Sequence, residues 1–247
     1  MSRPYLRFLG TGASGGTPGN GRSLRRESSV LAIDAPASIL IDVTRDFEDQ
    51  SRHLPEIGAV VITHGHADAS GGISSLNGWL KGRGIVVPIY ATGETLRLIS
   101  ARSRDLSNCD LNEFEPGERR RVGPWTLSCR LVPHARDSAR FPTVAWRLTS
   151  RGSSVVYASD VARPTADLRK FARDADVLVI DGATNKRRIF SHLRIDEDLP
   201  EVCRWSVDQI FITQIGKSVP AHDDLVQLMP QLCPRAEPAY DGLEVEL

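Results

Sequence analysis

The sequence predicts an α/β (α+β) fold in which two β-sheets pack together and helices cover them on the outside. Three observations lead to this prediction. Short apolar runs of the strand type dominate the first part of the chain. Strand-type runs then alternate with helix-type periodicity, and no repeat, low-complexity tract or linker interrupts the 247 residues. Strands followed by alternating strands and helices are typical of layered sheets with helices outside.

The first expected strand, residues 5–9, runs into a long glycine-rich loop. Three glycines of this loop match the dinucleotide-binding pattern G-x-G-x-x-G, and Asp34 follows at about the distance where such proteins place an acid. These glycines are Gly10, Gly12 and Gly15. A dinucleotide site needs a helix N-terminus directly after the glycines, but the chain continues through Pro18 into residues 29–34, which alternate like a strand. We therefore expect a glycine loop near an active site and rate the nucleotide alternative as weak.

Period-two alternation predicts the other strands of the first half, and 3.6-residue periodicity predicts its helices. A hairpin is expected to turn at Ala35–Pro36, and Thr92 is a candidate N-cap. The expected strands are residues 29–34, 38–42, 58–63 and 85–90, and the expected helices are 74–81 and 92–103, with a polar, helix-compatible stretch at 44–53.

The second half is expected to begin with strands and to end with strands and helices in alternation. One hairpin should turn around Arg151–Gly152. The expected strands are residues 125–132, 143–148, 153–158, 176–181, 209–213 and 243–247, and the expected helices are 166–175, 195–205 and 222–232.

The composition is ordinary for a globular protein, with 40% hydrophobic and 25% charged residues. Lys and Arg total 31, as do Asp and Glu, so the formal net charge is zero. Balanced charge gives no indication of general binding to nucleic acid or to anionic membranes, although a local basic patch stays open. No apolar run approaches the roughly 20 residues that cross a bilayer, and no apolar core of a secretory signal follows Met1. We therefore expect a cytoplasmic protein.

The four cysteines are far apart in the sequence and form no C-x-x-C pair. They are Cys109, Cys129, Cys203 and Cys233. This spacing favours reduced thiols and argues against a zinc ion held by cysteine.

The segment at residues 60–68 is the strongest candidate for chemistry. An apolar run of the strand type leads directly into His64, His66 and Asp68. Side chains alternate along extended backbone, so the two histidines are expected to point the same way. Two imidazoles beside a carboxylate are ligands that a divalent transition metal prefers. The alternative is a surface loop that happens to contain two histidines, which we regard as the weaker interpretation.

Further polar residues lie at or just past the ends of apolar strand runs, which would bring them to one edge of the sheets. Taken alone, His134 is more simply a loop histidine and Asp160 a helix cap. Together with the first segment they become natural additional ligands. The set is His64, His66, Asp68, His134, Asp160 and Asp181.

With these motifs, the chain resembles the metallo-β-lactamase fold superfamily. Within it, the chain is similar to the cyclic-phosphate phosphodiesterases of the carbon–phosphorus lyase pathway and to coenzyme PQQ synthesis protein B. The likeness rests on the glycine loop, Thr63-His64-Gly65-His66-Ala67-Asp68, Pro133-His134, Tyr157-Ala158-Ser159-Asp160 and the terminal Tyr240-Asp241-Gly242. It implies one domain over residues 1–247, a four-layer αββα sandwich of two mixed sheets, and a two-metal site.

The resemblance implies that His64, His66, His134 and Asp160 hold the first metal, and that Asp160 is shared with the second. The second would also need Asp68 and two histidines. Ala69 and Gln214 stand at the positions of those histidines. We therefore expect one divalent metal per chain, zinc first and manganese or iron as alternatives, with at most a weakly held hard ion between Asp68 and Asp160.

Basic residues and one more histidine bear on the substrate. Asn185-Lys186-Arg187-Arg188 is either a solvated charge run or a phosphate-binding segment beside the metal, and Lys217 is a further candidate cation. The resemblance implies that His192 contacts a phosphodiester, where it could donate a proton to the leaving oxygen. Asp68 is expected to act on the metal's water as a base or hydrogen-bond acceptor. His222 is expected to begin a helix and not to bind metal.

The leading hypothesis is therefore a metal-dependent hydrolase, a phosphodiesterase that acts on a small and potentially cyclic phosphodiester through a hydroxide on a single metal ion. Its expected partner is this small molecule, with no membrane, no general nucleic-acid binding and a homodimer as an option. One alternative is a mononuclear iron enzyme of oxygen or sulfur chemistry. The other is a non-catalytic binding protein with a vestigial site.

Overall fold

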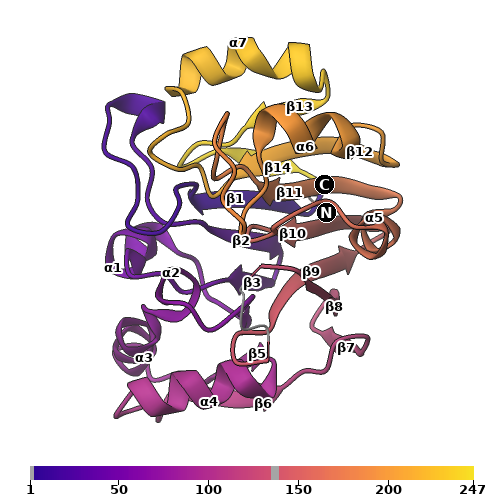
Figure 1. Cartoon of the computed structure of the whole chain (residues 1–247). Helices are drawn as coiled ribbons and strands as arrows, with labels where there is room; N and C mark the ends of the chain where they lie inside the picture. The colour runs from indigo at the N-terminus through magenta and orange to yellow at the C-terminus, as the bar shows by residue number, and fades with distance from the viewer. Residues whose placement is uncertain (1–2, 135–138) are drawn as a thin grey trace.

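The computed structural model describes residues 3–134 and 139–247. Two mixed β-sheets lie face to face, and helices cover the outer face of each sheet (Figure 1). The layers therefore follow the order helix, sheet, sheet, helix, as the sequence predicts.

The first sheet has the strand order β14-β1-β2-β3-β4-β5-β6. Neighbours from β14 to β3 are antiparallel and those from β3 to β6 are parallel. Its strands are β1 (Tyr5–Gly10), β2 (Ser29–Asp34), β3 (Ala37–Ile41), β4 (Ala59–Val61), β5 (Val87–Ala91), β6 (Cys109–Glu113) and β14 (Glu244–Glu246).

The second sheet has the strand order β13-β12-β11-β10-β9-β8-β7. Neighbours from β13 to β10 are parallel and those from β10 to β7 are antiparallel. Its strands are β7 (Arg119–Val122), β8 (Trp125–Val132), β9 (Thr143–Ser150), β10 (Ser153–Ala158), β11 (Ala175–Asp181), β12 (Val207–Thr213) and β13 (Ala236–Pro238).

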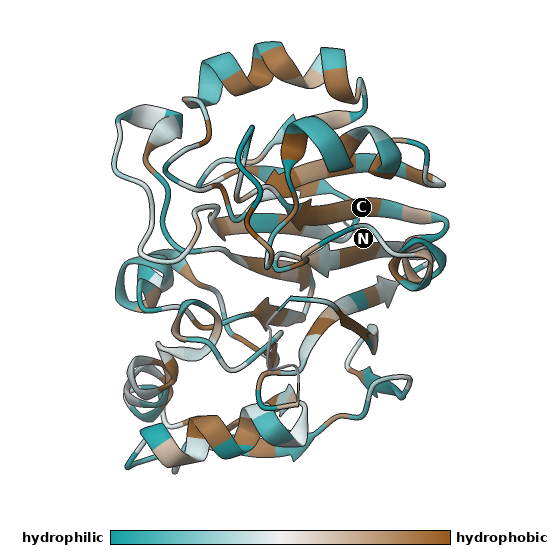
Figure 2. Cartoon of the chain, viewed as in Figure 1, coloured by the Kyte–Doolittle hydropathy of each residue, from teal (hydrophilic) through white to brown (hydrophobic). Residues whose placement is uncertain are grey.

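The helices fall into two groups, one on each outer face. The helices on the side of the first sheet are α1 (Phe47–Gln50), α2 (Ala67–Ser70), α3 (Ile73–Lys81) and α4 (Gly93–Arg102). The second sheet is covered by α5 (Ala166–Ala172), α6 (Ile195–Val202) and α7 (His222–Leu232). In Figure 2 the hydrophobic colour is concentrated in the strands, and brown and teal alternate along α4 and α7, as expected for amphipathic outer helices.

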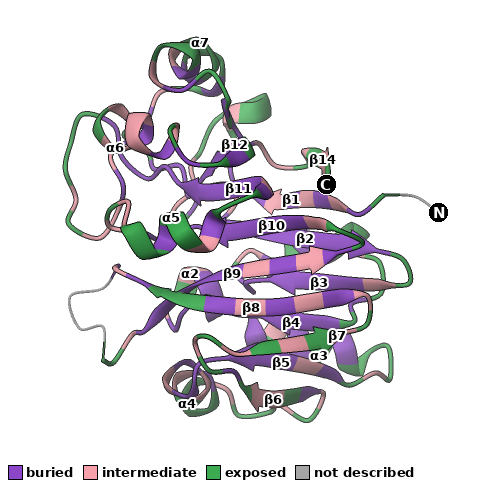
Figure 3. Ribbon diagram, turned by 90° about the vertical axis from the view of Figure 1, so that its right-hand side faces the viewer, coloured by how far each residue is buried: buried purple, intermediate pink, exposed green. Residues whose placement is uncertain are grey.

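Three apolar clusters hold these layers together. The middle cluster lies between the sheets and contains the buried rings of Trp125, Trp146 and Tyr157. The other two lie between each sheet and its helices. Strands such as β11 are therefore buried along most of their length (Figure 3), which explains their continuous apolar sequence.

Most expected elements are present, and the hairpins at Ala35–Pro36 and Arg151–Gly152 are confirmed. Thr92 caps α4, with its hydroxyl accepting a hydrogen bond from the Thr95 backbone N–H. Strand β4 is shorter than the predicted 58–63, because it ends at Val61. His64 and His66 therefore lie in the turn before α2, and strand alternation is the wrong reason for their shared direction.

Three strands were not predicted from the sequence. β6 and β7 are edge strands with mostly polar or charged residues, and β13 spans three residues with a proline. Edge strands lack the apolar alternation that identifies a half-buried strand, because water and not a core meets much of their surface.

The cysteines require a correction. Cys203 at the end of α6 and Cys233 at the end of α7 form a disulfide, so the expectation of four reduced thiols is wrong. The sequence separation of 30 residues concealed a pair whose Cα atoms lie 5.4 Å apart. Cys109 and Cys129 are free and buried, and burial raises their thiol pKa values to about 11 and about 12.

Within the described residues, no helix combines the length and apolar character needed to cross a membrane.

Candidate metal centre

The candidate residues gather at one edge of the two sheets because each follows the carboxyl end of a strand. His64 follows β4, His134 follows β8, and Asp160 follows β10. β8 and β10 run in the same direction, since each is antiparallel to β9. Strands that run in parallel end on the same side of a sheet, and this topology brings together residues that are up to 96 positions apart.

The three histidines form a compact triangle. Their ring centroids are 4.7 Å apart for His64–His66, 5.1 Å for His64–His134 and 5.4 Å for His66–His134. One nitrogen from each ring lies within 4.8 Å of one nitrogen of each of the others. Three imidazole nitrogens at this spacing suit a divalent transition metal.

His64 is held by a chain of buried hydrogen bonds. Its Nδ1 lies 2.9 Å from the Thr63 hydroxyl oxygen, and that hydroxyl donates to the Asp42 carboxylate. Asp42 also accepts from the Thr63 backbone N–H at 2.8 Å. The opposite ring nitrogen, Nε2, is buried and has no hydrogen-bond partner among the described residues. An oriented imidazole with one free buried nitrogen is the arrangement expected of a metal ligand.

His134 is oriented in the same way by a backbone carbonyl. Its Nδ1 lies 2.8 Å from the Ser191 carbonyl oxygen, which can only accept, so Nδ1 carries the proton and Nε2 carries the lone pair. This Nε2 lies 3.4 Å from the Nδ1 of His66. The His66 ring also packs against Phe141, with centroids 4.6 Å apart, which places an apolar wall on that side of the cluster.

Asp160 supplies the carboxylate of the candidate site. Its Oδ1 lies 3.8 Å from His134 Nε2, and its Oδ2 accepts a hydrogen bond from the Ser159 hydroxyl at 2.7 Å. One of its oxygens also lies within 4.8 Å of one nitrogen of His134 and one of His192. Joined to the histidine triangle through His134, it would complete a donor set of three nitrogens and one oxygen, which suits a tetrahedral zinc ion.

The protonation states also suit a metal. Burial lowers the pKa of His64 to about 3, and burial followed by the charge of His134 lowers the pKa of His66. Burial opposes ionisation of Asp160, but His64, His134 and His192 together bring its pKa below the usual range. Neutral imidazoles and an ionised carboxylate are the forms that bind metal.

The neighbouring position, where the resemblance implies a second metal, is built differently. The Gln214 side-chain amide donates from Nε2 to Asp160 Oδ1 at 2.7 Å and to Asp68 Oδ2 at 3.3 Å. Ala69 lies buried in α2 and offers no ligand atom. One neutral amide thus joins the two carboxylates, so the residues present do not fit a second tightly bound ion.

Asp68 and His192 each lie next to one histidine of the triangle. Asp68 Oδ1 lies 3.9 Å from His64 Nε2, and burial followed by the charge of Asp160 raises the Asp68 pKa to about 6. His192 lies 5.0 Å from His134 between ring centroids, and its Nδ1 is 2.7 Å from Asp181 Oδ2. Burial lowers the His192 pKa, but the Asp181 carboxylate outweighs it and raises the value to about 9.

The expected basic residues are less uniform. Arg188 forms ion pairs with Glu197 at 2.7 Å and Asp198 at 2.8 Å, so its charge is largely engaged at the start of α6. Lys186 and Arg187 are exposed beside it, and Lys217 is exposed after β12. Among the described residues, none of these four side chains makes a hydrogen bond or ion pair with the three histidines.

Sequence reasoning missed several residues that organise the site. Thr63 and Ser191 act through hydrogen bonds to the histidines, and Phe141 acts through ring packing. Glu27 is buried and accepts hydrogen bonds from the Arg45 guanidinium and from the Gly15 backbone N–H, which fastens the glycine loop beside Asp68. Of these residues, only Glu27 could have been singled out from the sequence, because it is an acidic residue close to the glycine loop. His222 begins α7, as predicted.

The glycine loop contains no helix in the position that a dinucleotide site needs. It is bridged to the chain at Glu27 and Ile215, and the next regular element is a short 3-10 turn at Gly21–Ser23. The preference for a loop near the site over a nucleotide site agrees with this geometry.

Comparison with known proteins identifies the family. A family model described as a beta-lactamase superfamily domain matches residues 33–223. The octanoyltransferase of Porphyromonas gingivalis (strain ATCC BAA-308 / W83) is 23% identical over 260 residues, which cover 96% of this chain and 50% of the relative. The chain therefore spans half the length of this curated relative.

Two solved structures have the same fold over nearly their whole length. A crystal structure of a new diphosphatase from the PhnP family aligns with a TM-score of 0.86 and 24% identity, covering 100% of this chain and 98% of that one. Zn²⁺-bound PqqB from Methylobacterium extorquens aligns with a TM-score of 0.81 and 19% identity, covering 98% of this chain and 100% of that one. These likenesses confirm the predicted αββα sandwich.

Proposed function

This chain belongs to the beta-lactamase superfamily, and from this premise we propose that it is a hydrolase of small phosphodiesters that works with a single metal ion. Most proteins of this fold are metal-dependent hydrolases. The observation that carries the proposal is the convergence of His64, His66 and His134 with Asp160. Phosphoryl chemistry is favoured because one of the similar folds is a diphosphatase.

In this proposal the three histidines and Asp160 hold the ion, with zinc as the first candidate and manganese or iron as alternatives. When bound, the ion supplies a Lewis acid that activates water and polarises the phosphoryl group. Asp68 stands beside His64 and accepts a hydrogen bond or proton from the attacking water. His192 donates a proton to the leaving oxygen, and Asp181 keeps the imidazole charged for this task.

The single-ion part of the proposal rests on Gln214. Its amide donates hydrogen bonds to both Asp68 and Asp160. In a two-metal site, a cation held by two further histidines would lie between these carboxylates. A neutral donor pair stabilises Asp68 and Asp160 side by side without a second ion. Gln214 is 2% exposed and its backbone has a left-handed φ of 56°, so neighbouring structure fixes the side chain.

Lys186, Arg187 and Lys217 are proposed to hold the substrate's remaining phosphoryl charge. Arg188 is left out of this role because Glu197 and Asp198 already engage it. Its contribution is to hold the segment after β11 against α6.

Hydrolysis of bis(p-nitrophenyl) phosphate tests the proposal directly. We expect activity with Zn²⁺ or Mn²⁺ that chelation removes, and a loss of about 100-fold or more in His64→Ala. Activity equal in wild type and His64→Ala would exclude the metal-dependent mechanism.

The role of His192 has a sharper readout than overall activity. His192→Gln should lower kcat about 100-fold for a phosphodiester with an alkyl leaving group, because an alkoxide needs a proton. The loss should be much smaller with p-nitrophenolate, which leaves without one. Equal losses with both leaving groups would assign His192 to another task.

Metal stoichiometry tests the Gln214 argument without any assay of activity. Metal analysis of the purified wild type should find one tightly bound ion per chain, whereas Ala69→His combined with Gln214→His should take up a second. Two tight ions in the wild type, or one in the double variant, contradicts the assignment. Ala69→His alone serves as the control, since the Gln214 amide remains in place.

A further inference from the structure

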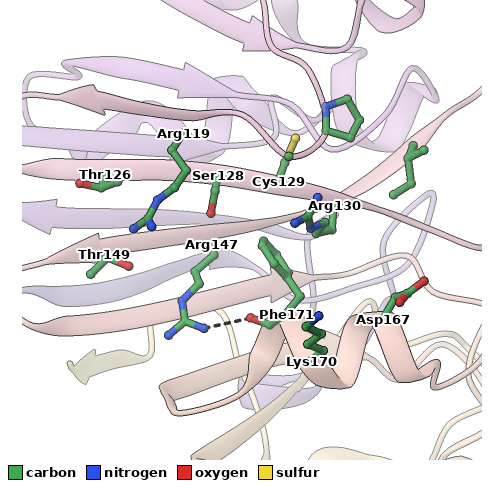
Figure 4. A pocket seen from close by; sticks show the side chains of 13 residues that line it. Arg119, Thr126, Ser128, Cys129, Arg130, Arg147, Thr149, Asp167, Lys170 and Phe171 are labelled. Atoms are coloured by element: carbon green, nitrogen blue, oxygen red, sulfur yellow. Dashed lines mark hydrogen bonds between the residues drawn. The ribbon is translucent and has the colours of Figure 1, made fainter.

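A polar groove with excess positive charge lies on the outer face of the second sheet, away from the histidine triangle. It has a volume of about 790 Å³, which is within the range of ligand sites. Strands β7, β8 and β9 form its floor, and α5 forms one wall (Figure 4). Three arginines and one lysine line it against a single acid, Asp167; the basic residues are Arg119, Arg130, Arg147 and Lys170.

Strand register places two of these arginines in one row. Ser128 on β8 pairs with Arg119 on β7 and with Arg147 on β9, so all three point outward from the same face. Two strand spacings put the arginine Cβ atoms about 10 Å apart across the Ser128 hydroxyl. Thr126 and Thr149 pair directly in the next outward row. The floor is thus lined by hydroxyls, with a guanidinium on each side.

Two of the three arginines of the groove have no anionic partner among the described residues. Arg119 and Arg130 make no hydrogen bond or ion pair there. Arg147 donates to the carbonyl oxygens of Phe171 and Arg173 at 2.9 Å each, which orients the guanidinium but leaves its charge. Burial lowers the pKa of Arg147, the charges of Asp174 and Asp176 oppose this change, and the charge of Arg119 has a smaller effect that lowers it. The unpaired charges of Arg119 and Arg130 therefore favour a bound anion.

From this arrangement we infer that the groove binds the phosphates of a single-stranded oligonucleotide. Charge is spread across the strands by Arg119 and Arg147 and along β8 by Arg130, which suits an extended polyanion better than one compact phosphate. The half-buried ring of Phe171 offers a face on which a base can stack. Beyond Leu131 the next hollow is lined by Glu94 and Glu115, which confines the anion to the groove. This binding is local and is separate from the proposed hydrolase activity.

Fluorescence anisotropy with a labelled 2′-O-methyl oligouridylate tests the inference on the full, metal-loaded chain, with a gel to show that the probe stays intact. We expect a Kd of about 1–100 µM at low salt. Arg119→Gln combined with Arg130→Gln should raise Kd about tenfold and reduce the salt slope by about 1.4, the value for two lost phosphate contacts to a single strand. Arg147 is kept, because it supports α5.

The matched control is Arg52→Gln combined with Arg204→Gln, which removes the same charge from exposed residues paired with Asp49 and Glu201. Its Kd should stay within about twofold of wild type. Equal losses in the two double variants, no binding at low salt, or binding of a phosphopeptide or of phosphatidylserine vesicles in place of the oligonucleotide would each overturn the inference. Hydrolysis of bis(p-nitrophenyl) phosphate should be unchanged in the groove variant, so the two proposals fail independently.

Discussion

At the scale of single residues, the candidate metal centre depends on side chains that do not touch the metal. Thr63 joins the Asp42 carboxylate to the His64 ring, with oxygen-to-oxygen and oxygen-to-nitrogen distances of 3.0 Å and 2.9 Å. The hydroxyl fixes the direction of the imidazole, and such supporting partners commonly change metal affinity 10–100-fold, as an order of magnitude.

Thr63→Val keeps the shape of the side chain and removes this hydroxyl. We expect zinc affinity, measured by competition with a chelating dye, to fall by about 10-fold or more. Thr63→Ser is the control, because it retains the hydroxyl and should bind zinc nearly as wild type does. An unchanged affinity in the valine variant would show that packing alone orients His64.

A second residue-scale prediction concerns His222, which is buried and whose ring centroid lies 5.5 Å from that of Tyr240. Burial lowers its pKa, and the charges of Arg22 and Arg25 lower it further. The unfolded chain therefore binds the proton more readily below about pH 6.5, the ordinary histidine value. The contribution of neutral His222 to the free energy of unfolding is complete above that pH. It is lost as the pH falls toward the lowered pKa of His222 in the folded protein.

Urea unfolding at pH 7.5 and pH 5.5 measures this effect. His222→Asn should lose less unfolding free energy than wild type over this interval, and the metal-site histidines are common to both proteins. A parallel loss in the two proteins would mean that His222 does not take up a proton preferentially on unfolding.

The sequence revealed the reactive residues of the centre but not their supports. His64, His66, His134 and Asp160 follow apolar strand runs and match a motif, so their convergence was predictable. The hydrogen bond from the Thr63 backbone N–H to the Asp42 carboxylate depends on parallel pairing of β3 with β4 and on a left-handed Asp42 with φ of 64°. Neither property can be predicted from local periodicity. The contact from Ser191 uses its backbone carbonyl, so the identity of the side chain does not indicate it.

At the scale of elements, α3 has two glycines that differ in whether the structure leaves room for a Cβ atom. Gly72 caps its start, and a Cβ there would lie 2.0 Å from the Thr44 carbonyl oxygen. Gly78 lies inside the helix, and a Cβ there would meet nothing within 4 Å. The first glycine is required by a close backbone approach, whereas the second only weakens the helix.

Gly78→Ala should therefore stabilise the protein by about 0.5–1 kcal/mol, because alanine restricts the unfolded chain and favours helix. Gly72→Ala should destabilise it by about 1–3 kcal/mol, because the carbonyl of Thr44 cannot move cheaply. Urea midpoints at constant m-value measure both changes. Shifts of the same sign in the two variants would contradict this account of α3.

Elements with a clear apolar face were predictable, and those without one were not. β8 and α7 have the bounds that the sequence predicts, because each buries one periodic face. β6, β7 and β13 owe their existence to a neighbouring strand that offers free backbone groups. Their pairing is a tertiary effect that local sequence does not predict. The position of Arg119 in the groove is likewise set by the register of β7 with β8.

At the scale of the whole molecule, the candidate metal centre joins the two sheets. His64 and His66 come from the connection after β4 in the first sheet, whereas His134 and Asp160 follow strands of the second. An ion bound to all four side chains would link the sheets at the edge where the apolar core ends. Binding to the folded chain alone stabilises it by mass action.

We therefore expect Zn²⁺ to raise the unfolding free energy by about 2.7 kcal/mol when its free concentration is 100 times Kd. Thermal unfolding in a metal buffer measures this shift, and chelation should reverse it. His134→Ala removes one of the two ligands from the second sheet, so zinc should stabilise this variant far less although His64, His66 and Asp160 remain. Lys186→Ala is the control, because it changes a proposed substrate contact and leaves all four ligands. If zinc stabilised His134→Ala as strongly as wild type, His134 would not be a ligand, and the proposed link between the sheets would lose one of its two attachments to the second sheet.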